Sequence, residues 1–328
     1  MKENKYGVFI VSLDFEMMWG CHDKNTPDKY GSTNIRQVRT VINRLLELFQ
    51  KYDVHATFAT VGLIFCSDKT EALSQFPSQI PSYNNVLRSP YRDGYIESIN
   101  PNYEYLYFAP DVIAHLKTYP NIEIGTHTYS HYYCWEKGQT ISQFEADMEM
   151  ACKVAKASDV VLQSIVFPRN QVTKEYLTVC AKYGIRTFRG NPRKYFDETT
   201  NRFKILYQKI ARLLDTYVNW GGNTTYPYTE IDRNESPINV PASRMLRPYM
   251  RNLRIFEGLR LRRIKKEMQY AAKHHELYHL WWHPHNFGAN MEENLSFLEN
   301  VLKCYWKCHQ KEGMKSMTMN EIYKFVNE

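Results

Sequence analysis

The sequence predicts an α/β fold in which helices alternate with the strands of a parallel sheet. Apolar runs of strand length recur along the chain, and between them apolar residues repeat at the spacing of an amphipathic helix. The chain has 328 residues, of which 43% are hydrophobic and 23% charged, so it can bury a full core. We expect one catalytic domain over residues 1–328, although this length also allows two small domains.

The first βαβ unit has the clearest pattern. Residues 6–13 form a nearly continuous apolar run, as expected of a central strand buried on both faces. Apolar residues at helical spacing follow between 35 and 49, and a second strand-like run covers 54–61. A helix between two such runs predicts neighbouring parallel strands.

The alternation continues downstream with two interruptions. Helices are predicted near 111–118, 142–156, 173–183, 203–217, 259–273 and 292–307, and strands at 122–125, 162–167, 185–188 and 277–283. The irregular stretches 63–108 and 189–240 indicate two long insertions near the strand ends. This spacing does not decide whether the sheet is open or closed into a barrel.

Two histidines directly after one predicted strand are candidate metal ligands. Gly125-Thr-His-Thr-Tyr-Ser-His131 places His127 and His131 four residues apart. On one turn of helix they would point the same way and could bind one cation. The alternative is a pair of ordinary surface or core histidines.

Other polar clusters follow other predicted strands. Asp14 and Glu16 follow the first strand, Arg169 and Asn170 follow the fourth, and His283 and His285 follow the last. The carboxyl ends of parallel strands meet at one edge of a sheet, so these groups are expected to converge on one site. Only one histidine of the last pair is expected close to a metal.

These motifs also resemble those of a known family. They are Val11-Ser-Leu-Asp-Phe-Glu16, His55-Ala-Thr-Phe-Ala-Thr-Val-Gly62, Gly125 to His131, Phe167-Pro-Arg-Asn-Gln171 and Leu280-Trp-Trp-His-Pro-His285. Their order is similar to that of the polysaccharide deacetylases, the NodB-homology carbohydrate esterases of family 4. The resemblance implies a deformed (β/α) barrel with about seven parallel strands.

The resemblance also implies roles for individual residues. Asp14 matches the catalytic base, His283 the general acid, and Arg169 the arginine that orients the base. His127 and His131 match the metal ligands. The expected cofactor is a divalent metal ion, with zinc as the first choice. Trp282, His285 and Asn170 are our candidates for contacts with the substrate.

One position departs from the family pattern. The family has two adjacent aspartates, whereas Phe15 stands in the second place here. On a strand Asp14 and Glu16 point to the same side and Phe15 points away, which favours Glu16 as the third metal ligand. The alternative is a weaker site with two histidines, completed by water.

The expected function is metal-dependent N-deacetylation of an acetamido sugar in the synthesis of a surface polysaccharide or lipopolysaccharide. Two alternatives remain open. One is a hydrolase of another C–N bond. The other is a catalytically silent homologue that binds a glycan, an alternative based on the departure from the family pattern at Phe15.

The distribution of charge suggests a partner. The formal net charge is +7, and residues 244–266 hold nine basic residues against the single acid Glu257. We expect this segment to bind an anionic membrane or a lipid-linked substrate. No readout motif accompanies it, which argues against nucleic acid. No apolar run reaches ~20 residues, and the seven cysteines show no CxxC pair or close regular spacing, which predicts a cytoplasmic location. The basic segment extends this expectation to the inner face of the membrane.

Overall fold

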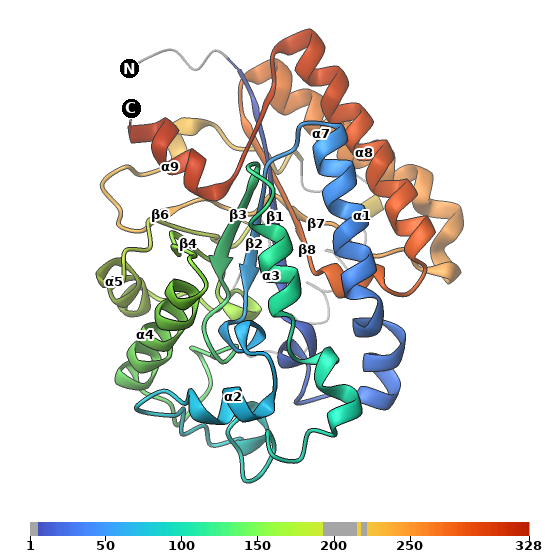
Figure 1. The fold of residues 1–328 in the computed structure, drawn as a ribbon. Coiled ribbons are helices and arrows are strands. Elements are labelled where there is room, and N and C mark those ends of the chain that lie inside the picture. The colour runs from blue at the N-terminus through green and yellow to red at the C-terminus, as the bar shows by residue number, and fades with distance from the viewer. Residues whose placement is uncertain (1–5, 193–214, 218–221, 328) are drawn as a thin grey trace, which may run out of the picture.

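The computed structural model describes residues 6–192, 215–217 and 222–327 (Figure 1). Its strands are β1 Val8–Phe15, β2 Ala56–Thr60, β3 Ile122–Thr126, β4 Ser164–Ile165, β5 Thr187–Phe188, β6 Ile238–Asn239, β7 Arg244–Met245, β8 Leu277–Trp282 and β9 Lys315–Met317. Its helices are α1 Val38–Lys51, α2 Lys69–Ser74, α3 Pro110–Leu116, α4 Ile141–Ala157, α5 Lys174–Lys182, α7 Glu257–His274, α8 Met291–Glu312 and α9 Met319–Asn327. The predicted helix at 203–217 lies outside the described residues, except that 215–217 are helical.

The sheet confirms the predicted parallel α/β barrel. In the described part of the chain the strand order is β6-β5-β4-β3-β2-β1-β8-β7, every pairing along it is parallel, and β9 pairs with β1. All eight residues of β1 are buried, as its apolar run predicts.

A short segment joins the two ends of this sheet. The N–H of Val240 donates to the carbonyl of Phe188 in β5, and three residues later the N–H of Ser243 donates to the carbonyl of His279 in β8, both across 2.9 Å. The chain therefore leaves one edge and joins the other between β6 and β7, which curls the sheet into a deformed barrel. With β6 and β7 taken as one interrupted strand, the barrel has the expected seven strands and β9 lies beside it.

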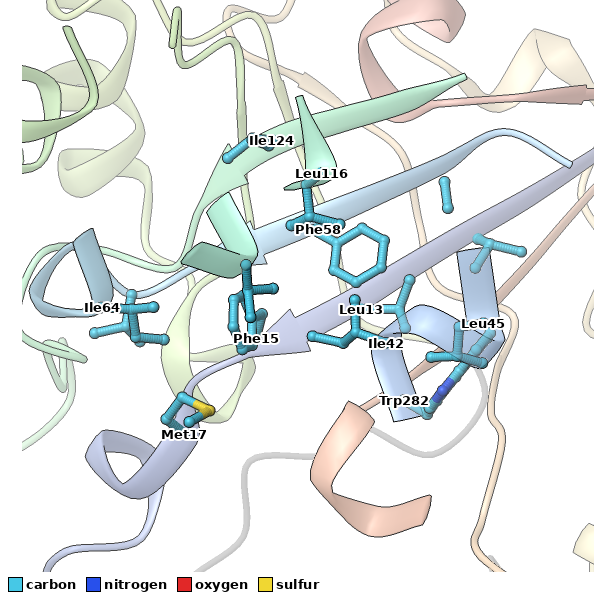
Figure 2. Close-up of a cluster of buried hydrophobic side chains, with 14 of the residues drawn as sticks. Leu13, Phe15, Met17, Ile42, Leu45, Phe58, Ile64, Leu116, Ile124 and Trp282 are labelled. Carbon is cyan, nitrogen blue, oxygen red and sulfur yellow. The ribbon is translucent and has the colours of Figure 1, made fainter. Parts of the chain in front are cut away.

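Side chains of β1 alternate between two environments. Leu13 and Phe15 point outward into the main hydrophobic core, which also holds Ile42 and Leu45 of α1 (Figure 2). The intervening residues point into the barrel. Near the amino end of β1 they belong to a second apolar cluster, which α9 completes: Val8, Ile10, Val166, Ile238, Val240, Leu277, Met319 and Ile322. The base of the barrel is thus apolar, and polar interior groups gather at its carboxyl end.

The basic segment 244–266 is only partly exposed, which corrects the expectation that it presents its charge to a partner as a whole. Arg244 is buried with Glu267 and Asp215, each at 3.0 Å. Arg263 is buried 3.0 Å from Glu267, and Arg260 is buried in an ion pair with Glu257. The charges of these three guanidinium groups are compensated inside the protein and are not presented at its surface.

No helix within the described ranges combines the length and apolar character needed to cross a bilayer.

Candidate metal and catalytic site

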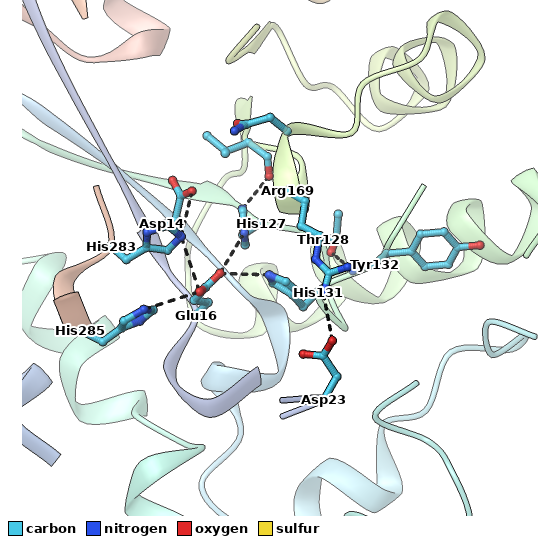
Figure 3. A network of polar contacts seen from close by, with 12 residues as sticks. Asp14, Glu16, Asp23, His127, Thr128, His131, Tyr132, Arg169, His283 and His285 are labelled. Atoms are coloured by element: carbon cyan, nitrogen blue, oxygen red, sulfur yellow. Dashed lines mark hydrogen bonds and ion pairs between the residues drawn. The ribbon is translucent and has the colours of Figure 1, made fainter. Parts of the chain in front are cut away.

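The site is built first by the carboxyl end of β1. Asp14 and Glu16 are both buried, and both face the barrel interior (Figure 3). Phe15 between them is in the hydrophobic core. Space for the Glu16 carboxyl depends on Gly20, since a Cβ at that position would clash with it. The alternation expected from the sequence therefore brings the two carboxylates together.

The two histidines of the H-x3-H motif lie on a loop and not on a helical turn, which corrects the sequence prediction. Thr128 and His131 have left-handed backbone conformations, with φ of 65° and 59°. Asp147 of α4 holds the loop by accepting from the N–H groups of Tyr129 and Ser130 at 2.7 and 3.1 Å. The fixed loop, and not helical periodicity, turns both imidazoles toward β1.

Glu16, His127 and His131 form a buried group of ligand atoms. Glu16 Oε2 lies 3.0 Å from Nε2 of His131 and 3.4 Å from Nε2 of His127. The three ligand atoms all lie within 4.8 Å of one another, and among the described residues they form the group suited to a metal ion. One carboxylate and two imidazoles are a common donor set for zinc. The geometry favours Glu16 as the third ligand.

The protonation of this group also fits a cation. His127 Nδ1 lies 2.7 Å from the carbonyl oxygen of Val166, so this nitrogen donates to the carbonyl and Nε2 is the ring nitrogen that faces Glu16. Burial lowers the pKa of His131. Burial alone would raise the pKa of Glu16, but His283, His127 and His131 bring it well below its ordinary value. Glu16 is therefore ionised between the two imidazoles.

Asp14 is held by an arginine that the sequence analysis missed. Arg189 follows β5, is fully buried, and donates to both carboxylate oxygens of Asp14 at 2.6 and 2.8 Å. Burial raises the pKa of Asp14, but the charges of Arg189 and the neighbouring His283 outweigh it and the pKa is lowered. Arg189 thus keeps Asp14 ionised and fixes its orientation.

Arg169 does not perform this role, which corrects its assignment as the residue that orients the base. Its backbone is left-handed, with φ of 56°, and its guanidinium lies 2.9 Å from Asp23 and 4.2 Å above the ring of Tyr133. Asn170 was predicted to contact the substrate. In the structure its side-chain oxygen accepts a hydrogen bond from Arg189 at 3.1 Å.

Both histidines that follow β8 approach the carboxylates, whereas only one was expected to. His283 Nε2 lies 3.7 Å from Asp14 Oδ2 and 3.6 Å from Glu16 Oε1, and His285 Nε2 lies 3.9 Å from the same Glu16 oxygen. The side chain of His283 is 21% exposed and that of His285 is 7% exposed. Burial lowers the pKa of His285 to about 4. His283 is the more accessible of the two.

The predicted contact between Trp282 and the substrate is wrong. Its side chain is fully buried and stacks on Phe287, with ring centroids 5.8 Å apart. Trp281 points the other way, over the Arg189 guanidinium at 4.2 Å. Among the described residues it lines a cavity of about 470 Å³ together with Arg169 and Asn170. Trp281 therefore replaces Trp282 as the aromatic candidate beside the site.

Comparison with known proteins gave one family match. The family described as polysaccharide deacetylase matches residues 23–188. No curated protein matches the sequence significantly.

Solved structures share the fold at low sequence identity. A protein from Mycobacterium smegmatis assigned to the polysaccharide deacetylases has a TM-score of 0.61 at 11% identity, over 100% of this chain and 92% of its own. PuuE allantoinase has a TM-score of 0.54 at 11% identity, over 99% of this chain and 91% of its own. At these identities the likeness concerns the fold alone.

Proposed function

The chain belongs to the polysaccharide deacetylase family, and on this basis we propose that it is a metal-dependent N-deacetylase of an acetamido sugar. The observation that carries the proposal is the convergence of two sets of groups. The candidate ligands Glu16, His127 and His131 lie beside Asp14, which Arg189 orients, and beside the accessible His283. An ion site, a base and an acid are the three parts that metal-assisted amide hydrolysis uses.

The candidate ligands would hold a divalent cation, with zinc as the proposed ion. When bound, the cation supplies Lewis acidity toward the acetyl carbonyl and the attacking water. The protein contributes a water-poor setting, because Glu16, His127 and His131 are all buried. The hydrogen bond from His127 to the carbonyl of Val166 keeps that imidazole in the correct tautomer and orientation.

Asp14 is the proposed general base. Its lowered pKa keeps it ionised at neutral pH, and two bonds from Arg189 aim its carboxylate at the site. It takes one proton from the attacking water, whose oxygen forms the new bond to the acetyl carbon. The C–N bond then breaks, and the products are acetate and a free amine on the sugar.

His283 is the proposed general acid. It donates a proton to the departing amine nitrogen, and its partial exposure allows it to reach that atom. His285 is more deeply buried and its pKa is lowered, so its proposed role is to pack beside Glu16 at the edge of the substrate site. Trp281 is the proposed stacking surface for the sugar, with Arg169 and Asn170 further along the cavity wall.

The proposed substrate is a nucleotide-linked or lipid-linked acetamido sugar that serves as a precursor of surface polysaccharide or lipopolysaccharide. The test is a panel of N-acetylated sugars in free, nucleotide-linked and lipid-linked form, incubated with the zinc-loaded protein. The expected result is equal amounts of acetate and free amine from at least one sugar, and none with Asp14→Asn. Hydrolysis of allantoin, included because an allantoinase shares the fold, would instead support a hydrolase of another C–N bond. Glycan binding without product or bound metal would support a silent homologue.

The proposed location is the cytoplasmic face of a membrane, and the proposed contact surface lies around the start of α7. Exposed apolar side chains cluster around the start of α7, at Met250, Ile255, Phe256 and Leu259. Exposed cations accompany them at Arg251, Arg254, Arg262 and Lys266. Apolar side chains bordered by cations suit the interface of an anionic bilayer. We call these eight residues the α7 surface.

A further inference from the structure

His279 is a buried histidine outside the proposed catalytic groups, and the hydroxyl of Ser12 connects it by hydrogen bonds to Arg189. His279 projects from β8 into the barrel interior and is fully buried. Its Nε2 lies 2.8 Å from the hydroxyl of Ser12 in β1, and its Nδ1 lies 3.2 Å from the carbonyl oxygen of Pro241. Both ring nitrogens of His279 therefore have hydrogen-bond partners, and one of these, Ser12, is also bonded to Arg189.

The partners fix the direction of each hydrogen bond. The carbonyl oxygen of Pro241 only accepts, so Nδ1 of His279 carries the proton. Burial lowers the pKa of His279 to about 3, so the ring is neutral and its Nε2 accepts. The Ser12 hydroxyl must then donate to Nε2, which leaves its oxygen lone pairs free to accept from the Arg189 guanidinium at 3.1 Å.

Arg189 is held on one side by the hydrogen-bonded pair of Ser12 and His279, and on the other side by the side-chain amide of Asn170. One of its terminal nitrogens is shared between Ser12 and Asp14, and the second is shared between Asn170 and Asp14. Among the described residues, the buried Nε of Arg189 has no hydrogen-bond partner. The neutral oxygens of Ser12 and Asn170 therefore hold the plane of the guanidinium in line with the Asp14 carboxylate.

We propose that His279 and Ser12 are positioning residues for the reaction, which act by fixing the orientation of Arg189 and through it that of Asp14. The inference rests on the proposed function for its catalytic part. Without His279 the Ser12 hydroxyl can rotate, and its lone pairs are no longer held toward Arg189. Among the described residues, the hydrogen bonds of the His279 ring and the Ser12 hydroxyl join them to each other, to Pro241 and to Arg189, and not to the candidate metal ligands.

The test compares His279→Leu, His279→Gln and Ser12→Ala with the unchanged zinc-loaded protein. The probe is 4-nitrophenyl acetate, and the rate with Asp14→Asn is subtracted as background. The expected result is a loss of tenfold or more in kcat for His279→Leu and Ser12→Ala, with KM and bound zinc unchanged. His279→Gln, whose side-chain oxygen can accept from Ser12, is expected to recover part of kcat.

Two controls separate positioning from general damage. Ser164→Ala removes another buried hydroxyl, which is bonded to Glu123 and Thr187, and should leave kcat unchanged. The double variant of Ser12 and His279 should lose no more kcat than the worse single variant, because the two residues act in series. Unchanged kcat in both single variants, or losses that multiply in the double variant, would overturn the proposal.

A crystal structure gives a readout that does not depend on turnover. In His279→Leu, or in Ser12→Ala if the former does not fold, the Arg189 guanidinium should rotate away from its two bonds to Asp14. Retention of both bonds at their present lengths would overturn the proposal. If the unchanged protein shows no hydrolysis that depends on Asp14, the proposed function fails, and this structural readout still decides whether His279 positions Arg189.

Discussion

Arg189 and Asp14 are 175 positions apart in the sequence, yet the guanidinium of Arg189 donates to both oxygens of the Asp14 carboxylate. Both side chains are buried, so neither charge is solvated by water. A buried pair of this kind is costly to break, because the remaining charge has no partner. The pair therefore links the carboxyl ends of β1 and β5 and sets the ionisation of the proposed base.

The first prediction compares two arginines. Arg189→Lys should lower kcat by about a hundredfold or more, because an ammonium group cannot form the paired bonds that fix the carboxylate. Arg169→Lys should lower kcat far less, since Arg169 bonds to Asp23 and not to Asp14. The measurement is kcat for both variants, with thermal unfolding to verify that each is folded. A larger loss from Arg169→Lys would restore our original assignment.

The second prediction separates the adjacent tryptophans. Trp282→Ala should destabilise the protein by about 3–5 kcal/mol, because it removes a fully buried ring from the core. Trp281→Ala should lower kcat/KM for the sugar by about tenfold with a much smaller loss of stability. Urea unfolding and steady-state kinetics on both variants provide the comparison. If both variants lost only stability, Trp281 would have no role in binding the sugar.

The third prediction concerns Asp147 and pH. Burial raises its pKa from 3.8 to about 7, so the folded protein keeps a proton that the unfolded chain releases. The contribution of the protonated Asp147 carboxyl to the free energy of unfolding is fully present below about pH 4 and is lost as the pH rises through about 7. The free energy of unfolding should therefore decline between pH 5 and 8 by roughly 2–4 kcal/mol more in the unchanged protein than in Asp147→Asn.

Urea unfolding of the metal-free protein at the two pH values measures this difference. The other titrating groups are common to both proteins and cancel in the comparison. Equal pH dependence in the two proteins would show that Asp147 is ionised in the folded state across this range.

The fourth prediction concerns the α7 surface. Changing Arg251, Arg254 and Arg262 to Gln should weaken binding to anionic vesicles by about fivefold per residue, because each cation near such a surface contributes ~1 kcal/mol. The control changes the exposed Lys153, Lys156 and Lys174 of α4 and α5 to Gln, which removes the same charge from the side of the molecule opposite α7 (Figure 1).

Vesicle co-sedimentation at low and high salt compares these two variants with the unchanged protein. High salt should release the unchanged protein from anionic vesicles. The control variant should bind as strongly as the unchanged protein at low salt. Equal recovery of all three proteins on neutral and anionic vesicles would leave the α7 surface as an ordinary solvated surface.

Periodicity predicted most of the fold. Long elements such as β1, α1 and α8 have enough residues to show their pattern, and the parallel barrel follows from their alternation and the family resemblance. The strands β6 and β7 escaped prediction because they lie within and just after the irregular stretch 189–240, and the three-residue β9 because so few residues show no period. Their positions depend on pairing with strands distant in sequence. The two-residue strands β4 and β5 were predicted because they lie within longer apolar runs.

The site was predicted in part, for related physical reasons. Strand alternation placed Asp14 and Glu16 on one side of β1, and the same rule applied to β8 would have selected Trp281, which shares a side with His283, over Trp282. The choice between Arg169 and Arg189 was different, because each follows a strand. A left-handed turn at Arg169 and the distance to Asp14 decide it, and the sequence shows neither directly.

The most direct test of the account is the amount of zinc bound per chain by the unchanged protein, Glu16→Gln and Asp14→Asn. We predict close to one zinc ion in the unchanged protein and in Asp14→Asn, which keeps the three candidate ligands. Glu16→Gln should bind zinc at least tenfold more weakly, because it replaces the one carboxylate among those ligands. Loss of the ion from Asp14→Asn with retention in Glu16→Gln, or an unchanged protein that binds no zinc, would contradict the proposed metal site.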